Sequence, residues 1–231
     1  MLRVGGLTPL STTDWPDMLV AVVFCQGCPW RCGYCHNPDL IPTHSENEIP
    51  WNDVLAFLRR RQGLLDGVVF SGGEPTLQAD LADAMREVRA LGFKIGLHTG
   101  GAYPRRLAAV LPLVDWVGLD AKAPFADYER ITGVVGSGAR ALTSLERVLA
   151  SGVDHEIRTT VHPALLADAE VVSLARELSA RGAKRYVVQA FRSQGCADTA
   201  LVRGAVREQP LTNLVKEVSS LFQAGKETAT G

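Results

Sequence analysis

The sequence predicts an α/β fold in which six mostly parallel strands form a partial (βα)6 barrel with helices on its outside. Short runs rich in valine, isoleucine and leucine alternate along the chain with longer segments whose apolar residues recur at three- and four-residue spacing. Such alternation is typical of a parallel sheet whose right-handed crossovers place the helices outside. Six units are too few to close an eight-unit barrel, so an open or partial barrel is expected.

The expected strands are short and apolar, and the first of them reads LVAVVF. They lie at residues 19–24, 68–70, 94–97, 116–119, 156–161 and 186–190. The helices between them carry an apolar stripe, as in 51–65, where Trp51, Val54 and Leu58 share one face. The other expected helices lie at 77–91, 105–111, 141–150, 168–180 and 211–222.

Length and composition fit a single domain at residues 1–223, followed by a tail at 224–231. The chain has 231 residues, of which 46% are hydrophobic, enough to bury a sizeable core. The formal net charge of -1 gives no electrostatic footprint for nucleic acid or an anionic membrane. No apolar run is long enough to span a bilayer, and no charged region precedes the short run at 18–24. These features predict a cytoplasmic protein with reduced thiols and with no nucleic-acid or membrane partner.

Chemically reactive side chains follow the predicted strands. Cys28 comes after the first strand and Glu74 after the second, while Thr99 and Asp120 follow the third and the fourth. Arg158 lies within the fifth strand. Because α/β proteins build their sites on the loops at the carboxyl ends of parallel strands, these side chains are expected to converge.

Cys28, Cys32 and Cys35 form a dense cluster of metal-binding side chains. In a reducing compartment such a cluster favours metal binding or catalysis over disulfides. Thiolates are soft ligands that suit zinc, copper(I) or iron–sulfur clusters. A structural zinc ion normally has four protein ligands, and here the fourth would be Cys25 or His36. If neither residue binds, one coordination position stays open for a reactant, and the spacing alone leaves both interpretations open.

Residues 28–35 read CPWRCGYC, which resembles the CxxxCxΦC signature of the radical S-adenosylmethionine (radical SAM) superfamily, with Tyr34 at the aromatic position. The sequence GGEP at 72–75 strengthens the resemblance. The resemblance implies a radical SAM-type fold and a 4Fe–4S cluster that three cysteines bind and whose fourth iron S-adenosylmethionine chelates. An electron from the reduced cluster would then cleave the sulfonium C–S bond, giving methionine and a 5′-deoxyadenosyl radical.

Gly72, Gly73 and Glu74 place a glycine pair and a carboxylate at a strand end. Glycines let a ligand approach the backbone, and a carboxylate matches a cationic amine. The resemblance implies that this motif binds the ammonium group of S-adenosylmethionine. On the next loop Thr99 matches the pattern common in the superfamily, Asp-Thr-Asn-Gly, whereas His98 replaces its carboxylate and is expected to be a satisfied strand-end histidine.

Asp120 and Lys122 form an Asp-x-Lys pattern that resembles glycyl-radical enzyme activating enzymes. The resemblance implies that Asp120 helps to bind a monovalent cation near the cofactor and that Lys122 is catalytic together with the three cysteines. Arg158, in a predicted buried strand, needs a carboxylate partner. That partner is either the methionyl carboxylate, as in related activating enzymes, or Asp120 or Glu156 in a structural ion pair, and the sequence leaves the choice open.

Several longer stretches are similar to the anaerobic ribonucleoside-triphosphate reductase activating proteins. They are GGLT at 5–8, STTDWP at 11–16, the cysteine loop with its flanks at 26–38, GLDAK at 118–122 and RTTVHP at 158–163. The resemblance implies that the radical abstracts hydrogen from a backbone glycine of the reductase. The expected partners are therefore that reductase and a low-potential electron donor such as flavodoxin or ferredoxin.

Two other functions are compatible with these motifs. A small-molecule radical SAM enzyme, such as 7-carboxy-7-deazaguanine synthase, would need magnesium and a small closed pocket for a pterin. The plain CxxxCxΦC loop and the Asp-x-Lys pattern favour the activating enzyme over it. A non-catalytic metal-binding or redox module, the third possibility, would not consume S-adenosylmethionine.

Overall fold

The computed structural model describes residues 1–204 and 211–227, with side chains through residue 222. Strands and helices alternate along most of the chain, as the sequence predicts. The elements are β1 (Val4–Ser11), β2 (Val20–Cys25), α1 (Trp51–Arg59), β3 (Gly67–Gly72), α2 (Leu81–Ala90), β4 (Lys94–Thr99), α3 (Pro104–Val110), β5 (Trp116–Asp120), α4 (Tyr128–Thr132), α5 (Ser137–Ser151), β6 (Asp154–Val161), α6 (Asp168–Ala180), β7 (Tyr186–Ala190), α7 (Thr199–Arg203) and α8 (Leu211–Glu227).

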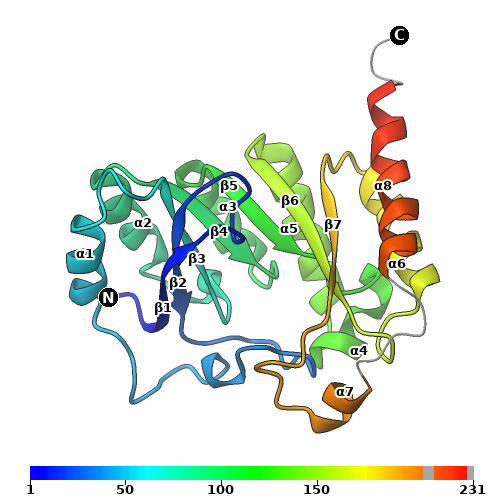
Figure 1. Cartoon of the computed structure of the whole chain (residues 1–231), viewed down its shortest axis with the longest axis horizontal. Helices are drawn as coiled ribbons and strands as arrows, with labels where there is room; N and C mark the ends of the chain where they lie inside the picture. Colours follow the sequence, from blue (N-terminus) through cyan, green and yellow to red (C-terminus); the bar gives the residue numbers. More distant parts are fainter. Residues whose placement is uncertain (205–210, 228–231) are drawn as a thin grey trace.

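One seven-stranded sheet forms the framework, with strands in the order β1-β2-β3-β4-β5-β6-β7. Neighbouring strands from β2 to β7 are parallel, and β1 is antiparallel to β2. Strand order follows chain order, so β1 and β7 are the two edges of an open sheet (Figure 1). The predicted α/β architecture with mostly parallel strands is confirmed, and the six predicted strands correspond to β2 through β7.

Strand β1 was not predicted from the sequence. Gly5, Gly6 and Pro9 interrupt the alternation of apolar and polar residues that indicates a strand. β1 lies at the edge of the sheet, where a proline costs no ladder hydrogen bond, and its register with β2 shifts at two places. β1 tolerates this irregular sequence because an edge strand pairs within the sheet on one side only; its Val4 also forms an isolated bridge with Ile49.

The helix bounds depart from the predictions where local turns intervene. α1 ends at Arg59 rather than at residue 65, just after Leu58, the last buried residue of its stripe. α2 begins at Leu81 rather than at residue 77, since the preceding 3-10 turn, Pro75–Leu77, is a separate element. α5 begins at Ser137 rather than at residue 141, after Gly136 in the left-handed conformation. By contrast, α6 and β7 have the predicted bounds.

The carboxyl-terminal helix is longer than predicted. α8 continues to Glu227, so residues 224–227 of the expected tail are helical, and residues 228–231 lie outside the described residues. The single domain predicted at 1–223 stays a prediction. Within residues 1–204 and 211–227, no helix combines the length and the hydropathy needed to cross a bilayer.

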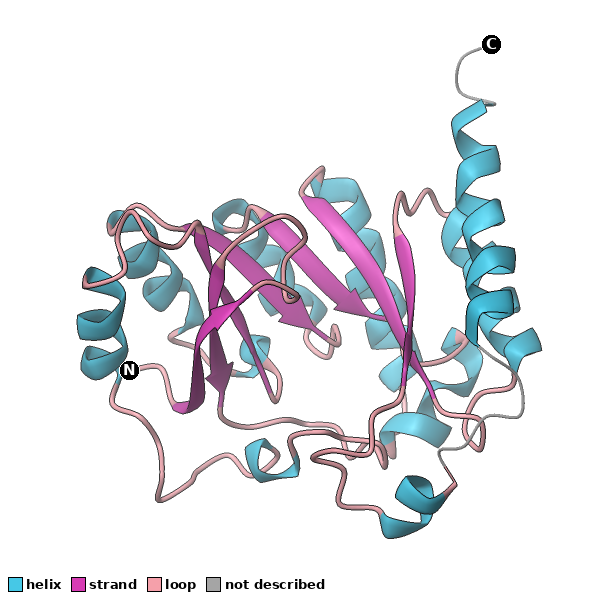
Figure 2. Cartoon of the chain, in the orientation of Figure 1, coloured by secondary structure: helices cyan, strands magenta, loops and turns pink. Residues whose placement is uncertain are grey.

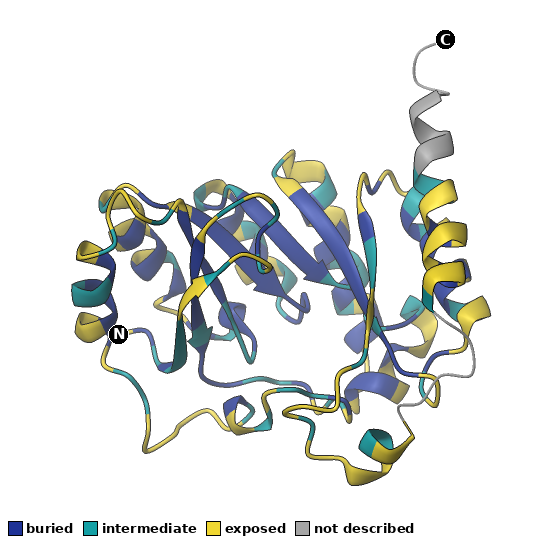
Figure 3. Ribbon diagram, in the orientation of Figure 1, coloured by how far each residue is buried: buried dark blue, intermediate teal, exposed yellow. Residues whose placement is uncertain are grey.

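The main apolar core lies between the sheet and the helices, which Figure 2 shows behind the sheet and at its sides. Strands β3, β4 and β5 are buried along most of their length (Figure 3). The helices on this side bury apolar stripes such as Leu81, Met85 and Val88 of α2. This packing holds the strands in place, so the loops at their carboxyl ends are supported by a rigid sheet.

A second, smaller apolar cluster lies on the other face of the sheet. It contains Trp15, Val20, Val22, Val69 and Trp116. Trp15 belongs to the loop between β1 and β2, which curls in front of the sheet in Figure 1, and its ring stacks on that of Trp116 with centroids 5.6 Å apart. Gly96 leaves room for it, because a Cβ there would lie 2.8 Å from the Trp15 ring. This loop therefore covers the face of the sheet opposite the main core, near the amino ends of the strands. The candidate site lies at the carboxyl ends.

Candidate active site

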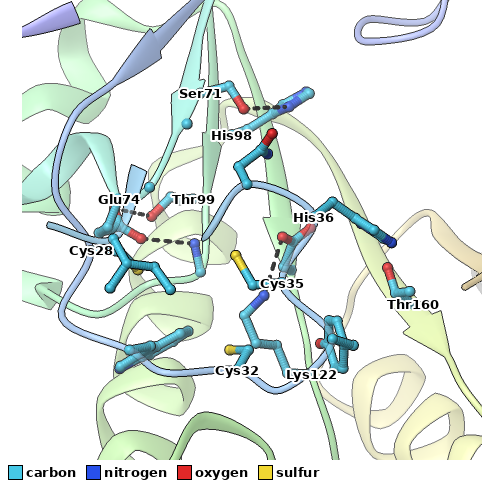
Figure 4. A pocket seen from close by; sticks show the side chains of 18 residues that line it. Cys28, Cys32, Cys35, His36, Ser71, Glu74, His98, Thr99, Lys122 and Thr160 are labelled. Atoms are coloured by element: carbon cyan, nitrogen blue, oxygen red, sulfur yellow. Dashed lines mark hydrogen bonds and ion pairs between the residues drawn. The ribbon is translucent and has the colours of Figure 1, made fainter. Parts of the chain in front are cut away.

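A cavity of about 150 Å³ lies at the carboxyl ends of the strands (Figure 4). Of the residues singled out in the sequence, those that line it are Cys28, Cys32, Tyr34, Cys35, His36, Gly72, Gly73, Glu74, His98, Thr99, Asp120 and Lys122. They come from the loops after β2, β3, β4 and β5, which are neighbours in the parallel sheet. The structure therefore brings these residues together, whereas Arg158, on β6, is the one predicted cofactor-binding residue outside the lining.

The cysteine loop is held by backbone hydrogen bonds to segments on both sides of it. The amide of Cys28 donates to the carbonyl of Ile41 at 3.1 Å. The amide of Arg31 donates to the carbonyl of Thr132, at the end of α4, at 2.8 Å. The loop thus adopts a defined path although it contains no regular secondary structure.

Burial changes the acidity of two thiols in this loop. Burial raises the pKa of Cys28 to about 12, and it also raises the pKa of Cys32. The positive charge of Lys122 acts in the opposite direction at both thiols. Without a metal these two sulfurs are therefore protonated at neutral pH, and a metal that binds them has to displace their protons.

The two residues proposed as a fourth zinc ligand differ in their availability. Cys25 ends β2 and is fully buried in the main core. The Nε2 atom of His36 is 2.9 Å from the carbonyl oxygen of Arg192, with which it forms a hydrogen bond. In residues 1–204 and 211–227, no three His, Cys, Asp or Glu side chains are grouped as ligands of a single ion. Cys25 is therefore unavailable as a fourth ligand, whereas the hydrogen bond at Nε2 leaves the Nδ1 atom of His36, which lines the cavity, able to bind a metal.

Gly72 and Gly73 are required by the protein's own backbone. Gly72 has φ of +116°, and a Cβ there would lie 2.4 Å from the amide nitrogen of Cys25. A Cβ at Gly73 would lie 2.3 Å from the carbonyl oxygen of Gly27. The glycine pair therefore lets the β3 loop pack against the segment that leads into the cysteine loop. The expectation that these glycines admit a ligand to the backbone gives only part of the reason for them.

The carboxylate of Glu74 connects two loops inside the protein. It accepts hydrogen bonds from the Thr76 amide (3.1 Å), the Thr99 hydroxyl (2.7 Å) and the Gly100 amide (2.9 Å). Burial raises the pKa of Glu74, and these hydrogen bonds oppose the rise. Three of the four donors, including the Thr76 hydroxyl, bond to Oε1, whereas Oε2 accepts only from Gly100 and so retains acceptor capacity for a ligand. Its visible role is to brace the loops after β3 and β4.

The loop after β5 is closed by Tyr128, which no sequence motif singles out. The hydroxyl of Tyr128 accepts a hydrogen bond from the Lys122 amide at 2.9 Å and donates one to the Asp120 carbonyl at 3.0 Å. Tyr128 thereby fixes the two ends of the Asp-x-Lys turn. Its position six residues beyond Lys122 matches no pattern that a single sequence would reveal.

The Lys122 ammonium lies between a carboxylate and two aromatic rings. Its Nζ atom is 3.5 Å from Asp120 Oδ2, and 5.9 and 5.7 Å from the ring centroids of Trp30 and Tyr34. Burial opposes ionisation of both partners, but Tyr34 and Asp120 hold the pKa of Lys122 well above its ordinary value, and Lys122 and Arg158 hold that of Asp120 below its own. The pair therefore stays ionised, and the aromatic rings of the cysteine loop lie within cation–π distance of Lys122.

Arg158 lies behind this pair. Its Nε atom is 3.7 Å from Asp120 Oδ1, whereas Glu156 pairs with Arg185 at 3.1 Å. If Arg158 forms a structural ion pair, its partner is thus Asp120 and not Glu156. Gly118 gives the guanidinium its space, since a Cβ there would lie 2.5 Å from it. The buried Nε of Arg158 has no hydrogen-bond partner among the described residues, so it retains donor capacity.

His98 is satisfied by protein groups, as expected. Its Nε2 lies 2.7 Å from the carbonyl oxygen of Asp14, in the loop before β2, and its Nδ1 lies 3.4 Å from the Ser71 hydroxyl. Burial, assisted by the charge of Arg158, lowers the pKa of His98 to about 3. The ring is therefore neutral at physiological pH and connects β4 to the loop that carries Trp15.

Acid is expected to destabilise the protein through His98. In the unfolded chain the imidazole gains a proton near pH 6.5, whereas in the folded protein it stays neutral down to about pH 3. The stability it contributes is complete above pH 6.5 and declines as the pH falls from 6.5 toward 3. Between pH 7 and pH 5 this amounts to about 2 kcal/mol. Urea unfolding at both pH values should show this loss in the wild type and a smaller loss in His98→Gln, and equal losses would contradict it.

The segment after β7, residues 191–196, packs against the cysteine loop, although the two are far apart in the sequence. The rings of His36 and Phe191 stack with centroids 5.4 Å apart. A Cβ on Gly195 would lie 2.3 Å from the His36 carbonyl oxygen, so the two backbones touch. The Cys196 Sγ lies 3.6 Å from the carbonyl oxygen of Gly33. Cys196 therefore contacts the loop but does not line the cavity.

Comparison with known proteins identifies similarity over most of the chain. Residues 22–178 match the sequence profile of the Radical SAM superfamily. A Methanocaldococcus jannaschii protein, inferred to be a glycyl-radical enzyme activating enzyme, is 29% identical over 205 residues, covering 84% of this chain and 82% of the relative. The pyruvate formate-lyase-activating enzyme of Clostridium pasteurianum is 32% identical over 171 residues, 71% of each chain.

Solved structures share the fold. Streptococcus suis SuiB, bound to its precursor peptide SuiA, matches with a TM-score of 0.69 and 16% identity, covering 90% of this chain and 46% of SuiB. SuiB bound to S-adenosylmethionine matches with a TM-score of 0.66 at the same identity, covering 88% of this chain. This chain spans about half the length of SuiB, and at such low identity the likeness concerns the fold alone.

Proposed function

Because this chain belongs to the radical SAM superfamily, and within it to the glycyl-radical enzyme activating enzymes, we propose that it installs a glycyl radical on anaerobic ribonucleoside-triphosphate reductase. The observation that carries the proposal is the cavity in which Cys28, Cys32 and Cys35 meet the loops of Glu74 and Lys122. Membership in an enzyme family sets aside a non-catalytic metal-binding module. It also favours a protein substrate over the pterin of a 7-carboxy-7-deazaguanine synthase.

The residues of the cavity fit the cofactors of this family, a 4Fe–4S cluster and S-adenosylmethionine. Cys28, Cys32 and Cys35 would bind the cluster, and the lining provides no fourth free thiol for the remaining iron. The indole Nε1 of Trp30 and the Nε of Arg158 are buried without hydrogen-bond partners among the described residues, as donors that await a polar ligand would be. When bound, the reduced cluster supplies the electron that splits S-adenosylmethionine and so generates the hydrogen-abstracting radical.

The chain's own residues position these groups. We assign the ammonium of S-adenosylmethionine to the backbone of Gly72 and Gly73, which line the cavity while the Glu74 carboxylate braces them. Arg158 would act on the methionyl carboxylate, on Asp120, or on both. Asp120 is the candidate ligand of a monovalent cation. The Lys122 ammonium favours the thiolate form of Cys28 and Cys32, which lowers the cost of their deprotonation on metal binding.

The proposal that the protein substrate is this reductase is supported by the stretches at 5–8, 11–16 and 158–163. We place this activity in the cytoplasm, where thiols stay reduced. Anaerobic protein reconstituted with iron and sulfide should convert S-adenosylmethionine to 5′-deoxyadenosine when dithionite is added. With the cognate reductase present, electron paramagnetic resonance should then show a glycyl radical.

Three results would separate the levels of this proposal. A glycyl radical on pyruvate formate-lyase but none on the reductase would replace the substrate and leave the activating function standing. Turnover of a tetrahydropterin without any glycyl radical would overturn the activating function itself. Absence of 5′-deoxyadenosine from cluster-loaded protein would remove the enzyme activity altogether.

A further inference from the structure

A groove lined by four arginines lies on the outer wall of the sheet beside the candidate active site. Its volume is about 650 Å³, against about 150 Å³ for the cavity. The lining comes from the β4–α3 loop, α3 and α5 (Figure 1), and comprises Ala102, Tyr103, Pro104, Arg105, Arg106, Ala108, Arg140, Thr143 and Arg147. No acidic side chain lines the groove, so it carries a concentrated positive charge on a chain whose net charge is -1.

These four arginines lack the ion pairs that neutralise other arginines of the protein. Within the described part of the chain, no carboxylate lies within 4.0 Å of any of them. Elsewhere, pairs form between Arg89 and Asp115, Arg130 and Glu170, and Arg181 and Glu177. Like charges gathered without counter-charges repel each other, and a bound anionic surface would relieve that repulsion.

The spacing of the arginines suits an extended acidic surface. Arg140, Thr143 and Arg147 recur at three- and four-residue intervals, so they form one stripe along about 10 Å of α5. Arg105 and Arg106 face this stripe from α3. Two rows of guanidinium groups can bind several carboxylates in parallel, whereas a single phosphate would engage only part of the groove.

The groove lies next to loops that form the cysteine cavity. Arg106 also donates to the backbone carbonyls of Thr76 and Leu77, in the turn that follows Glu74. Tyr103, which lines the groove, comes three residues after Gly100, which lines the cavity. A protein docked in the groove is therefore near the cysteine loop without entering the cavity.

We propose that this arginine groove is the docking site for the acidic surface of the one-electron donor protein. The proposal rests on the proposed function, which requires an electron but does not say where the donor binds. A substrate glycine has to enter the cavity to lose its hydrogen atom, whereas an electron can cross a protein wall, so a partner on the outer wall fits the donor. One electron leaves the docked protein and is accepted by the enzyme's cluster, and no bond or proton moves at the groove.

The first test is binding of a flavodoxin with a net negative charge, measured by titration calorimetry. The double variant Arg140→Gln/Arg147→Gln should bind it about tenfold more weakly than the wild type. The matched control Arg59→Gln/Arg60→Gln removes two exposed arginines from the end of α1 and should bind like the wild type. Raising the salt concentration should weaken wild-type binding more than that of the groove variant. Equal affinities of the groove and control variants would overturn the proposal.

A second test compares two sources of electrons. With dithionite, which needs no docking, the groove variant should produce 5′-deoxyadenosine at the wild-type rate, while with reduced flavodoxin it should be about tenfold slower at limiting donor. Equal slowing with both reductants would overturn the docking role. If even the cluster-loaded wild type gives no product with dithionite, the proposed function fails, and the binding measurement still decides the groove. Displacement of flavodoxin by inorganic phosphate, beyond the effect of chloride at equal ionic strength, would overturn the choice of a protein partner.

Discussion

Replacing Cys32 by alanine is expected to abolish cluster binding and to reduce cleavage of S-adenosylmethionine at least about a thousandfold, equivalent to about 4 kcal/mol. Cys32 provides one of three thiols that line the cavity, and no other free thiol lines it. Two thiolates and a water molecule hold a cluster far less firmly than three thiolates. Anaerobic reconstitution followed by iron and sulfide analysis and a 5′-deoxyadenosine assay would measure both losses.

Cys196→Ala is the matched control for this variant. Its sulfur also contacts the cysteine loop, 3.6 Å from the Gly33 carbonyl, but lies outside the cavity lining. It should retain the full iron content and at least half of the activity. Loss of the cluster from Cys196→Ala, or its retention in Cys32→Ala, would show that the set of three ligands is wrong.

Substitution of Gly72 by alanine should destabilise the protein by about 2–5 kcal/mol. Gly72 has φ of +116°, which an L-residue adopts only with strain. In addition, the new Cβ would lie 2.4 and 2.6 Å from the amide nitrogen and carbonyl oxygen of Cys25. These are backbone atoms at the end of β2, which pairs with β1 on one side and β3 on the other, so no side chain can rotate away to make room.

Gly92→Ala isolates the conformational part of this effect. Gly92 also has a positive φ, +90°, but a Cβ there would meet nothing within 4 Å. It should cost about 1 kcal/mol by urea unfolding, and it should leave iron loading unchanged. A Gly72→Ala variant that is no less stable than Gly92→Ala would mean that the close contact between β3 and Cys25 is not present in solution.

Most of the sheet could be predicted from the sequence because its parallel strands are buried on both faces. A continuous apolar run such as LVAVVF at 19–24 is typical of a strand that is buried on both faces. β1 could not be predicted, since an edge strand needs no continuous apolar run and tolerates Pro9. The predicted starts of α2 and α5 were wrong because local turns at Pro75 and Gly136 precede these helices. Close packing, such as that of Gly138 against the Phe125 backbone, also cannot be predicted from the sequence.

The members of the candidate site were predictable from their spacing, but their contacts were not. Three cysteines in eight residues and residues that follow successive strands indicate where chemistry gathers. Arg158 neighbours Asp120 and not Glu156 because Glu156 forms an ion pair with Arg185, the residue just before β7. The sequence likewise could not show that the Glu74 carboxylate accepts hydrogen bonds from the loop after β4, or that Tyr128 closes the Asp-x-Lys turn.

The clamp that the segment after β7 places on the cysteine loop has a consequence for biosynthesis. The hydrogen bond between His36 and the Arg192 carbonyl joins residues 156 positions apart. A ribosome that adds about 5–20 residues per second needs roughly 8–30 s to cover that distance. Throughout this interval the cysteine loop lacks the contacts that this segment makes with it. Delivery of iron and sulfide by the cell is therefore best timed to the released, completely folded polypeptide.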